Sequence, residues 1–350
     1  MTNQDMKKMA IRASVFAVLA IGLMVHRSAT KHIMITDAAQ AHVDRGSADD
    51  SYSLLIDRNV PAGKENTLII PLSKSVSSDD IVLEDRYIDN ELHIYIDSRE
   101  EDFYMDNPVQ TDLDILTKAE CIKENDTGSV CLNFTLDGLY VNESSLTDSS
   151  TIEVRFSKPR DRYDRIAVVD PACGGSDTGY FTEELSEKDI TLEVAAALRE
   201  KAAGKPESDI RIFYTRLGDI DVSAKKRQKL IRDSGADLYV KLTCNMDSDR
   251  TDGITAYYND RFFIRGFSNA DFANLMEKSC LASTGAEAGG VKAADPEDEM
   301  IMECSIPAVC LDMGNLQGFG DSRRLAEDDY KEKMAEGLYQ ALLQAFEEMK

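Results

Sequence analysis

The sequence predicts an N-terminal all-β, sandwich-like domain followed by an α/β domain with a mostly parallel sheet and helices on both faces. Between residues 51 and 158, short apolar or alternating runs are separated by turn residues, which is typical of sandwich strands. From residue 165 onward, apolar runs alternate with segments of helical periodicity, which indicates a parallel sheet covered by helices. The predicted domains are therefore 1–30 (cytoplasmic tip and signal anchor), 31–160 (β-rich) and 161–350 (α/β).

Length and charge limit the class of protein. At 350 residues the chain is long enough for two domains of roughly 100 to 200 residues each. Its net charge is −24, from 40 basic and 64 acidic residues, and the basic residues are scattered along the chain. Because binding to nucleic acid requires a concentrated basic face, we expect no nucleic-acid partner.

The N-terminal segment resembles an export signal. Lys7, Lys8 and Arg12 lie within or before an apolar run over residues 9–25. No small-residue cleavage pattern follows, since residues 26–31 read HRSATK. We therefore expect an uncleaved membrane anchor over residues 9–25, with the N-terminus cytoplasmic and the bulk of the chain in the cell envelope. Secretion after cleavage of the signal is the alternative.

The β-rich part contains six apolar or alternating runs that we interpret as strands. They cover residues 51–56, 66–72, 81–88, 91–97, 130–136 and 151–156. Cys121 and Cys131 flank a turn near Asp126, so a hairpin would place them on neighbouring strands, either as a disulfide or as two separate thiols. The acidic stretch 99–114 is interpreted as a solvated loop.

The second part alternates strands and helices. The predicted strands are 166–170, 210–216, 238–243, 254–258, 300–306 and 308–314. The predicted helices are 190–203, 222–234, 269–283 and 329–349. In such folds ligands bind at the carboxyl ends of the strands. The residues at those ends are Asp170 to Gly175, Thr243 to Asn245 and Asp312 to Gly314.

These strand ends resemble the motifs of the zinc-dependent N-acetylmuramoyl-L-alanine amidases of bacterial cell walls. The family pattern D-P-G-H-G-G corresponds to Asp170–Gly175, E-K-D to Glu187–Asp189, and T-R to Thr215–Arg216. The pattern A-D-L-x-V-S-I-H-A-N corresponds to 236–245, and P-A-V-L-V-E-x-G to 307–314. Order and spacing agree over about 180 residues. The resemblance implies the amidase fold and peptidoglycan as the partner.

The resemblance also assigns roles position by position. The zinc ligands of the family fall on Cys173, Glu187 and Thr243, and its catalytic glutamate falls on Asp312. Only Glu187 keeps the family residue. A thiolate can replace a histidine as a zinc ligand, whereas a threonine hydroxyl is a far weaker donor. Zinc is therefore expected to be absent or weakly bound.

Several interpretations of the site remain open. The first is a non-catalytic module that binds peptidoglycan or a cell-wall enzyme and regulates cell-wall hydrolysis. The second is an active amide hydrolase with a remodelled site, in which Cys244 substitutes for Thr243 beside Cys173 and Glu187. A disulfide between Cys173 and Cys244 could also occupy the site, and Glu187 could be only a first-turn carboxylate. For the β-rich domain, its position alone suggests wall targeting.

Overall fold

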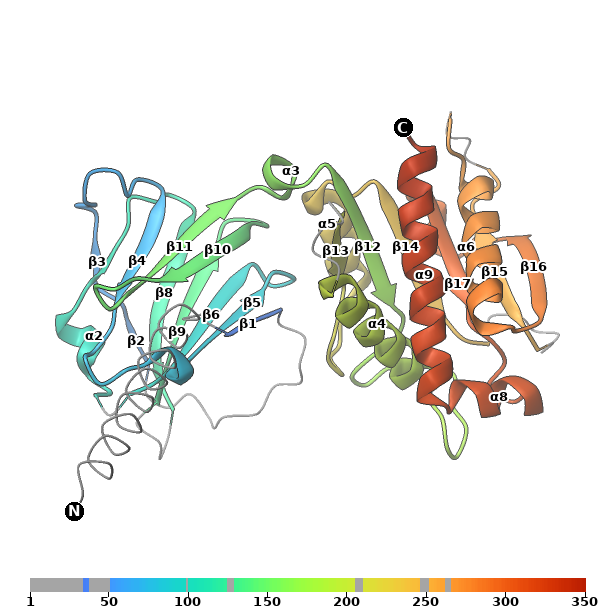
Figure 1. Ribbon diagram of the computed structural model, residues 1–350, viewed down its shortest axis with the longest axis horizontal. Helices are drawn as coiled ribbons and strands as arrows, with labels where there is room; N and C mark the ends of the chain where they lie inside the picture. The colour runs from blue at the N-terminus through green and yellow to red at the C-terminus, as the bar shows by residue number, and fades with distance from the viewer. Residues whose placement is uncertain are drawn as a thin grey trace, which may run out of the picture.

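The computed structural model describes two folded bodies joined by a short helix (Figure 1). It describes the backbone of residues 34–37 and then residues 51–98, 100–124, 129–204, 210–245, 252–261 and 266–350. The predicted anchor over 9–25 lies outside these residues. Within the described ranges, no helix combines the length and the apolar character needed to cross a membrane.

The first body is a β-sandwich. One sheet has the order β1-β5-β6-β9-β8-β2 and the other the order β10-β11-β4-β7-β3. The strands are β1 (Met34–Asp37), β2 (Ser51–Ser53), β3 (Ile56–Asp57), β4 (Thr67–Pro71), β5 (Ile81–Arg86), β6 (Glu91–Asp97), β7 (Val109–Gln110), β8 (Leu116–Lys123), β9 (Ser129–Leu136), β10 (Val141–Leu146) and β11 (Thr151–Ser157). Alternate apolar residues of both sheets form one buried core.

The second body is a six-stranded sheet with the order β13-β12-β14-β17-β15-β16. Its strands are β12 (Arg165–Pro171), β13 (Ile210–Tyr214), β14 (Leu238–Thr243), β15 (Ile254–Tyr258), β16 (Ala288–Ala293) and β17 (Ala308–Asp312). All neighbouring pairs are parallel except β15 with β17. The predicted fold class, a mostly parallel sheet after a β-sandwich, is confirmed.

Helices cover both faces of this sheet. The longer ones are α4 (Glu187–Ala203), α5 (Ala224–Ser234), α6 (Asn269–Thr284) and α9 (Asp328–Glu348). The shorter ones are η1 (Ser78–Asp80), α2 (Phe103–Asp106), α3 (Pro159–Arg162), α7 (Glu299–Met302) and α8 (Phe319–Leu325). Helices α4, α6 and α9 bury one face, on which Val169 and Val240 lie. Helices α5 and α7 contribute to burial of the opposite face, on which Val168 and Tyr239 lie.

Some predicted elements differ from the structure. The run 300–306, predicted as a strand, contains the end of α7 followed by non-strand residues. Periodicity cannot distinguish strand from helix in an apolar run this short. The stretch 99–114, predicted as a loop, contains α2 and β7. Strands β8, β10 and β16 escaped prediction because most of their residues are at least partly exposed and show no apolar alternation.

Cys121 and Cys131 of the β-rich body are two free thiols. Strands β8 and β9 pair in antiparallel fashion, with Cys121 opposite Leu132 and Cys131 opposite Ile122, while the predicted turn near Asp126 lies outside the described residues. Since neighbouring residues of a strand point to opposite faces, the two thiols lie on opposite faces of the sheet. Both are free and buried, so the possible disulfide between them is not formed.

Candidate functional site

The carboxyl ends of β12, β14 and β17 meet at one edge of the second body's sheet. The amide of Ala172 donates a hydrogen bond to the carbonyl of Leu242 at 3.0 Å, and the amide of Asn245 donates to the carbonyl of Gly314 at 3.1 Å. The segments that carry the predicted site residues are therefore joined directly to one another. This edge is where ligands bind in parallel sheets.

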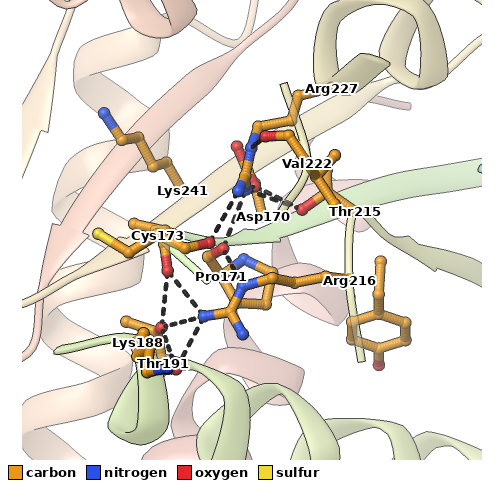
Figure 2. Close-up of polar contacts among 12 residues, drawn as sticks. Asp170, Pro171, Cys173, Lys188, Thr191, Thr215, Arg216, Val222, Arg227 and Lys241 are labelled. Atoms are coloured by element: carbon orange, nitrogen blue, oxygen red, sulfur yellow. Dashed lines mark hydrogen bonds and ion pairs between the residues drawn. The ribbon is translucent and has the colours of Figure 1, made fainter. Parts of the chain in front are cut away.

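Two arginines fix the loop that follows β12 (Figure 2). Arg216 donates from Nε to the carbonyl of Pro171 at 3.0 Å and from Nη2 to that of Ala172 at 2.7 Å. Arg227 donates from Nη1 to the carbonyl of Pro171 and from Nη2 to that of Cys173, both at 2.9 Å. Three consecutive carbonyl groups thus have charged donors, which fixes the loop in one conformation.

Asp170 is the counter-ion of the Arg227 guanidinium. Its carboxylate forms an ion pair with Arg227 and accepts hydrogen bonds of 2.5 Å from the hydroxyl groups of Thr215 and Tyr239. Asp170 is 1% exposed. Asp170 and the two arginines thus hold the loop in place.

Cys173 lies in the supported loop. Its φ of +64° is in the left-handed region, and Gly174 and Gly175 continue the turn at +121° and +59°. In Figure 2 its sulfur points away from the two guanidinium groups. Desolvation, followed by the nearby charge of Glu187, raises the pKa of the half-buried Cys173 thiol to about 12. The side chain is therefore a neutral thiol near pH 7.

Glu187 is held by peptide amides at the start of α4. The amide of Tyr180 donates to Oε2 at 2.9 Å, and the amide of Cys244 donates to Oε1 at 3.1 Å. The side chain is buried, and this desolvation raises the pKa of Glu187 despite both hydrogen bonds. The carboxylate connects the first turn of α4, the 173–186 loop and the end of β14.

Gly179 packs against both the Cys173 thiol and the Glu187 carboxylate. A Cβ atom at this glycine would lie 2.6 Å from Sγ of Cys173 and 2.4 Å from Oε2 of Glu187. Its φ is +60°. The thiol and the carboxylate therefore pack against the same backbone atoms, at a distance that only glycine permits.

Thr243 and Cys244 point to opposite faces of the sheet. The hydroxyl of Thr243 lies 3.5 Å from Sγ of Cys310, on the face that carries Tyr239. The thiol of Cys244 belongs to the core beneath α4, and burial raises its pKa well above the ordinary value. Cys244 reaches Glu187 through its peptide amide. Cys173 and Cys244 are both free thiols, so the possible disulfide between them is not formed.

Asp312 organises the backbone at the end of β17. Its Oδ1 accepts hydrogen bonds of 3.1 Å from the amides of Asn245 and Gly314. Asp312 is 4% exposed and lies opposite Thr243 on the neighbouring strand. The carboxylate at the position of the family base thus supports two turns of the site.

These residues do not fit a catalytic zinc ion. Such a site needs three protein donors of N, S or O type and an open fourth position. Of the three family ligand positions, Cys173 can supply a thiolate, because a bound metal displaces the thiol proton. Glu187 offers a carboxylate that already accepts two amides, and Thr243 offers only a neutral hydroxyl beside Cys310. Within the described residues, no three His, Cys, Asp or Glu side chains come together as a metal site.

A cavity of about 320 Å³ opens beside Cys173. Charged residues line it: Asp177, Asp221, Lys226 and Arg227. The sequence reasoning missed Asp219 and Asp221, which bind the amides of Gly175 and Ser176 at 2.7 and 3.1 Å. Their position in the loop that follows β13, at a strand's carboxyl end, was the signal that could have identified them.

A second groove of about 400 Å³ lies between residues 182–185 and α8. Phe181 adjoins one wall and Phe319 begins the helix that forms the other, and these side chains are 67% and 80% exposed.

The chain is similar to several N-acetylmuramoyl-L-alanine amidases of known sequence or structure. The chain is 25% identical over 178 residues to the N-acetylmuramoyl-L-alanine amidase CwlM of Bacillus licheniformis, which is 51% of this chain and 67% of that protein. It is also 25% identical over 202 residues to the germination-specific N-acetylmuramoyl-L-alanine amidase of Bacillus subtilis (strain 168), covering 53% and 81% of the two chains. The crystal structure of an N-acetylmuramoyl-L-alanine amidase from Clostridium difficile 630 matches 52% of this chain and 97% of its own, with a TM-score of 0.48 and 24% identity.

The family model described as N-acetylmuramoyl-L-alanine amidase matches residues 167–344, just over half of the chain. That range contains every predicted site residue, and all of the sheet and its covering helices except the start of β12 and the end of α9. The chain belongs to the N-acetylmuramoyl-L-alanine amidase family.

Proposed function

We propose that this chain is a non-catalytic member of the amidase family that binds peptidoglycan or a cell-wall enzyme and so regulates cell-wall hydrolysis. The observation that carries the proposal is the environment of Thr243. Thr243 is 2% exposed, and its neutral hydroxyl lies 3.5 Å from Sγ of Cys310. A hydroxyl in this position does not supply the third donor that a catalytic zinc requires.

The position of the base supports the same proposal. Aspartate is one methylene shorter than the family's glutamate, and Oδ1 of Asp312 accepts two backbone amides. Placement errors of about 1 Å can reduce a rate by roughly a hundredfold. The chain thus departs from the family both at the metal-ligand positions and at the position of the base. An active enzyme that had merely exchanged one ligand would keep the base unchanged.

The capacity to bind a cell-wall component has more structural support than the capacity to hydrolyse one. The loop after β12 keeps its supporting arginines, and the cavity beside Cys173 carries side chains of both charges. Peptidoglycan stems contain amine and carboxylate groups that such a lining can bind. Binding without hydrolysis is therefore the function that the geometry favours.

The test uses the full chain and purified peptidoglycan. We expect the chain to sediment with peptidoglycan, to contain less than one zinc per chain after zinc loading, and to release no peptide stems. One zinc per chain together with stem release would overturn the proposal. Failure to sediment with peptidoglycan would leave an interaction with a cell-wall enzyme as the remaining function, tested by adding the chain to a working amidase and measuring its rate.

A restored variant provides the matched control. Cys173→His, Thr243→His and Asp312→Glu together return the family residues to all three altered positions. If the groove is otherwise intact, zinc binding should return in this variant and be absent in the natural chain. Equal zinc content in both would argue that the altered positions are not the reason for a lack of metal.

An active amidase with a remodelled site is the alternative. It is favoured by the convergence of Cys173 and Cys244 on Glu187, the first through its side chain and the second through its amide. Cys244→Ala separates the two functions, because it removes the thiol and keeps the amide. Stem release that is present in the natural chain and lost in Cys244→Ala would support the alternative.

The location in the cell is proposed from the sequence alone. Residues 9–25 would anchor the chain in the membrane, with both folded bodies in the cell envelope. Protease added outside spheroplasts should then degrade the folded part, while the chain stays with the membrane fraction. Recovery of a shortened chain in the medium would instead indicate secretion after signal cleavage.

A further inference from the structure

Tyr87, in the turn that follows β5, contacts the edge strand β13 of the amidase-like sheet. The hydroxyl of Tyr87 donates to the carbonyl of Tyr214 at 2.8 Å and accepts from the amide of the same residue at 2.9 Å. Strand β13 is an edge strand, so its outward backbone groups have no strand to pair with. The Tyr87 hydroxyl of the β-rich body thus forms hydrogen bonds with both the N–H and the C=O group of Tyr214, at the end of β13.

Apolar packing surrounds this contact. The ring of Tyr87 meets that of Phe213 edge-on, with centroids 5.3 Å apart. Leu139 and Val141 of the β-rich body belong to the same buried cluster as Ile166. One core therefore contains side chains from both bodies, which is unusual for domains joined only by a flexible linker.

The same turn also holds helix α5. Asp89 forms an ion pair with Lys226, and Nζ of Lys229 donates to Oδ1 of Asn90 at 3.5 Å. The residue after Lys226 is Arg227, whose guanidinium binds the carbonyl groups of the Cys173 loop. The first turns of α5 therefore contact the β-rich body through Lys226 and the Cys173 loop through Arg227.

We propose that the β-rich body is a built-in positioning element of the amidase-like sheet. The turn at residues 87–90 closes the edge of β13 and orients α5, so the conformation of the Cys173 loop depends on the contact between the two bodies. A ligand or partner that displaces this turn would loosen the candidate site. The inference does not depend on whether the chain hydrolyses peptidoglycan.

Hydrogen exchange of the full chain tests the proposal. Tyr87→Phe removes the hydroxyl and keeps the ring. We expect amide exchange in β13 and α5 to become about tenfold faster, because two hydrogen bonds at the end of β13 are lost. Alkylation of Cys173 by N-ethylmaleimide, followed by peptide mapping, should accelerate in the same variant. A purely local loss of stability would leave the Cys173 rate unchanged.

Tyr104→Phe is the matched control. The hydroxyl of Tyr104 donates to the carbonyl of Pro71 at 3.0 Å, wholly within the sandwich, and this side chain is also buried. Its loss should accelerate exchange in the sandwich and leave β13, α5 and Cys173 unchanged. The proposal is overturned if folded Tyr87→Phe matches the natural chain in β13 and α5, or if both variants affect Cys173 equally.

A second variant decides the outcome if Tyr87→Phe does not fold. Asp89→Asn removes only the ion pair with Lys226, at a partly exposed position. We expect two- to threefold faster exchange in the first turn of α5 and faster alkylation of Cys173. Unchanged rates at both places would overturn the proposal.

Discussion

The peptide amide of Cys244 donates a hydrogen bond to a carboxylate oxygen of Glu187 at 3.1 Å, which joins the end of β14 to the first turn of α4. The amide of Tyr180 occupies the other oxygen. Two peptide dipoles thus partly offset the charge of a buried carboxylate at a position where the family places a metal ligand. Glu187, which stands at a family ligand position, thus holds three segments together.

Gly179 should be intolerant of any side chain. In Gly179→Ala the new methyl group would lie 2.4 Å from Oε2 of Glu187 and would also strain a backbone with φ of +60°. We expect the free energy of unfolding in urea to fall by about 2 kcal/mol or more. Gly285→Ala is the control, because its φ is +68° but no atom lies within 4 Å of the added methyl. A loss of about 1 kcal/mol is expected there. Equal losses would exclude a specific clash at Gly179.

Glu187 should give the stability a measurable dependence on pH. Burial raises the pKa of Glu187 above its ordinary value of 4.5, so the folded chain binds this proton more tightly than the unfolded chain. Its contribution to stability is therefore complete below pH 4.5 and is lost as the pH rises through the raised pKa. The free energy of unfolding of the natural chain, compared with that of Glu187→Gln, should decline from pH 4.5 upward. A difference that stays constant or increases with pH would contradict this assignment.

The amidase-like fold was largely predictable because the central strands of its sheet are buried on both faces. Strands such as β12 and β17 read as continuous apolar runs, and their order matched a known family. The structure brings Thr243, Asp312 and Glu187 to one edge of the sheet, as the sequence predicts, but the sequence does not give their contacts. Sequence identifies Thr243 as a ligand position, whereas only the structure shows its hydroxyl beside Cys310. The two amides on Glu187 could not be predicted, since backbone donors carry no residue signal.

Thr243 should be dispensable for stability. Its hydroxyl has a thiol at 3.5 Å, a weak contact, so Thr243→Val should change the free energy of unfolding by about 1 kcal/mol or less. Thr215→Val is the matched control, since its buried hydroxyl donates to Asp170 at 2.5 Å. A loss of about 1–3 kcal/mol is expected there, because the carboxylate would lose a donor. Urea unfolding measures both, and peptidoglycan sedimentation should be unchanged in Thr243→Val. A loss of binding in that variant would mean that the hydroxyl contacts the ligand.

Arg227 should be the most sensitive position of the site. Its guanidinium pairs with Asp170, which is 1% exposed, and also binds the carbonyl groups of Pro171 and Cys173. Arg227→Met leaves a buried carboxylate without its counter-ion, so we expect a loss of about 3–5 kcal/mol in the free energy of unfolding.

Arg232→Met on the same helix is the control. That side chain is 72% exposed and pairs with its neighbour Asp233, so a change within about 0.5 kcal/mol is expected. Because Asp170 causes the penalty, Asp170→Asn combined with Arg227→Met should recover part of the lost stability. Additive losses in the double variant would show that the buried charge of Asp170 is not the origin of the effect.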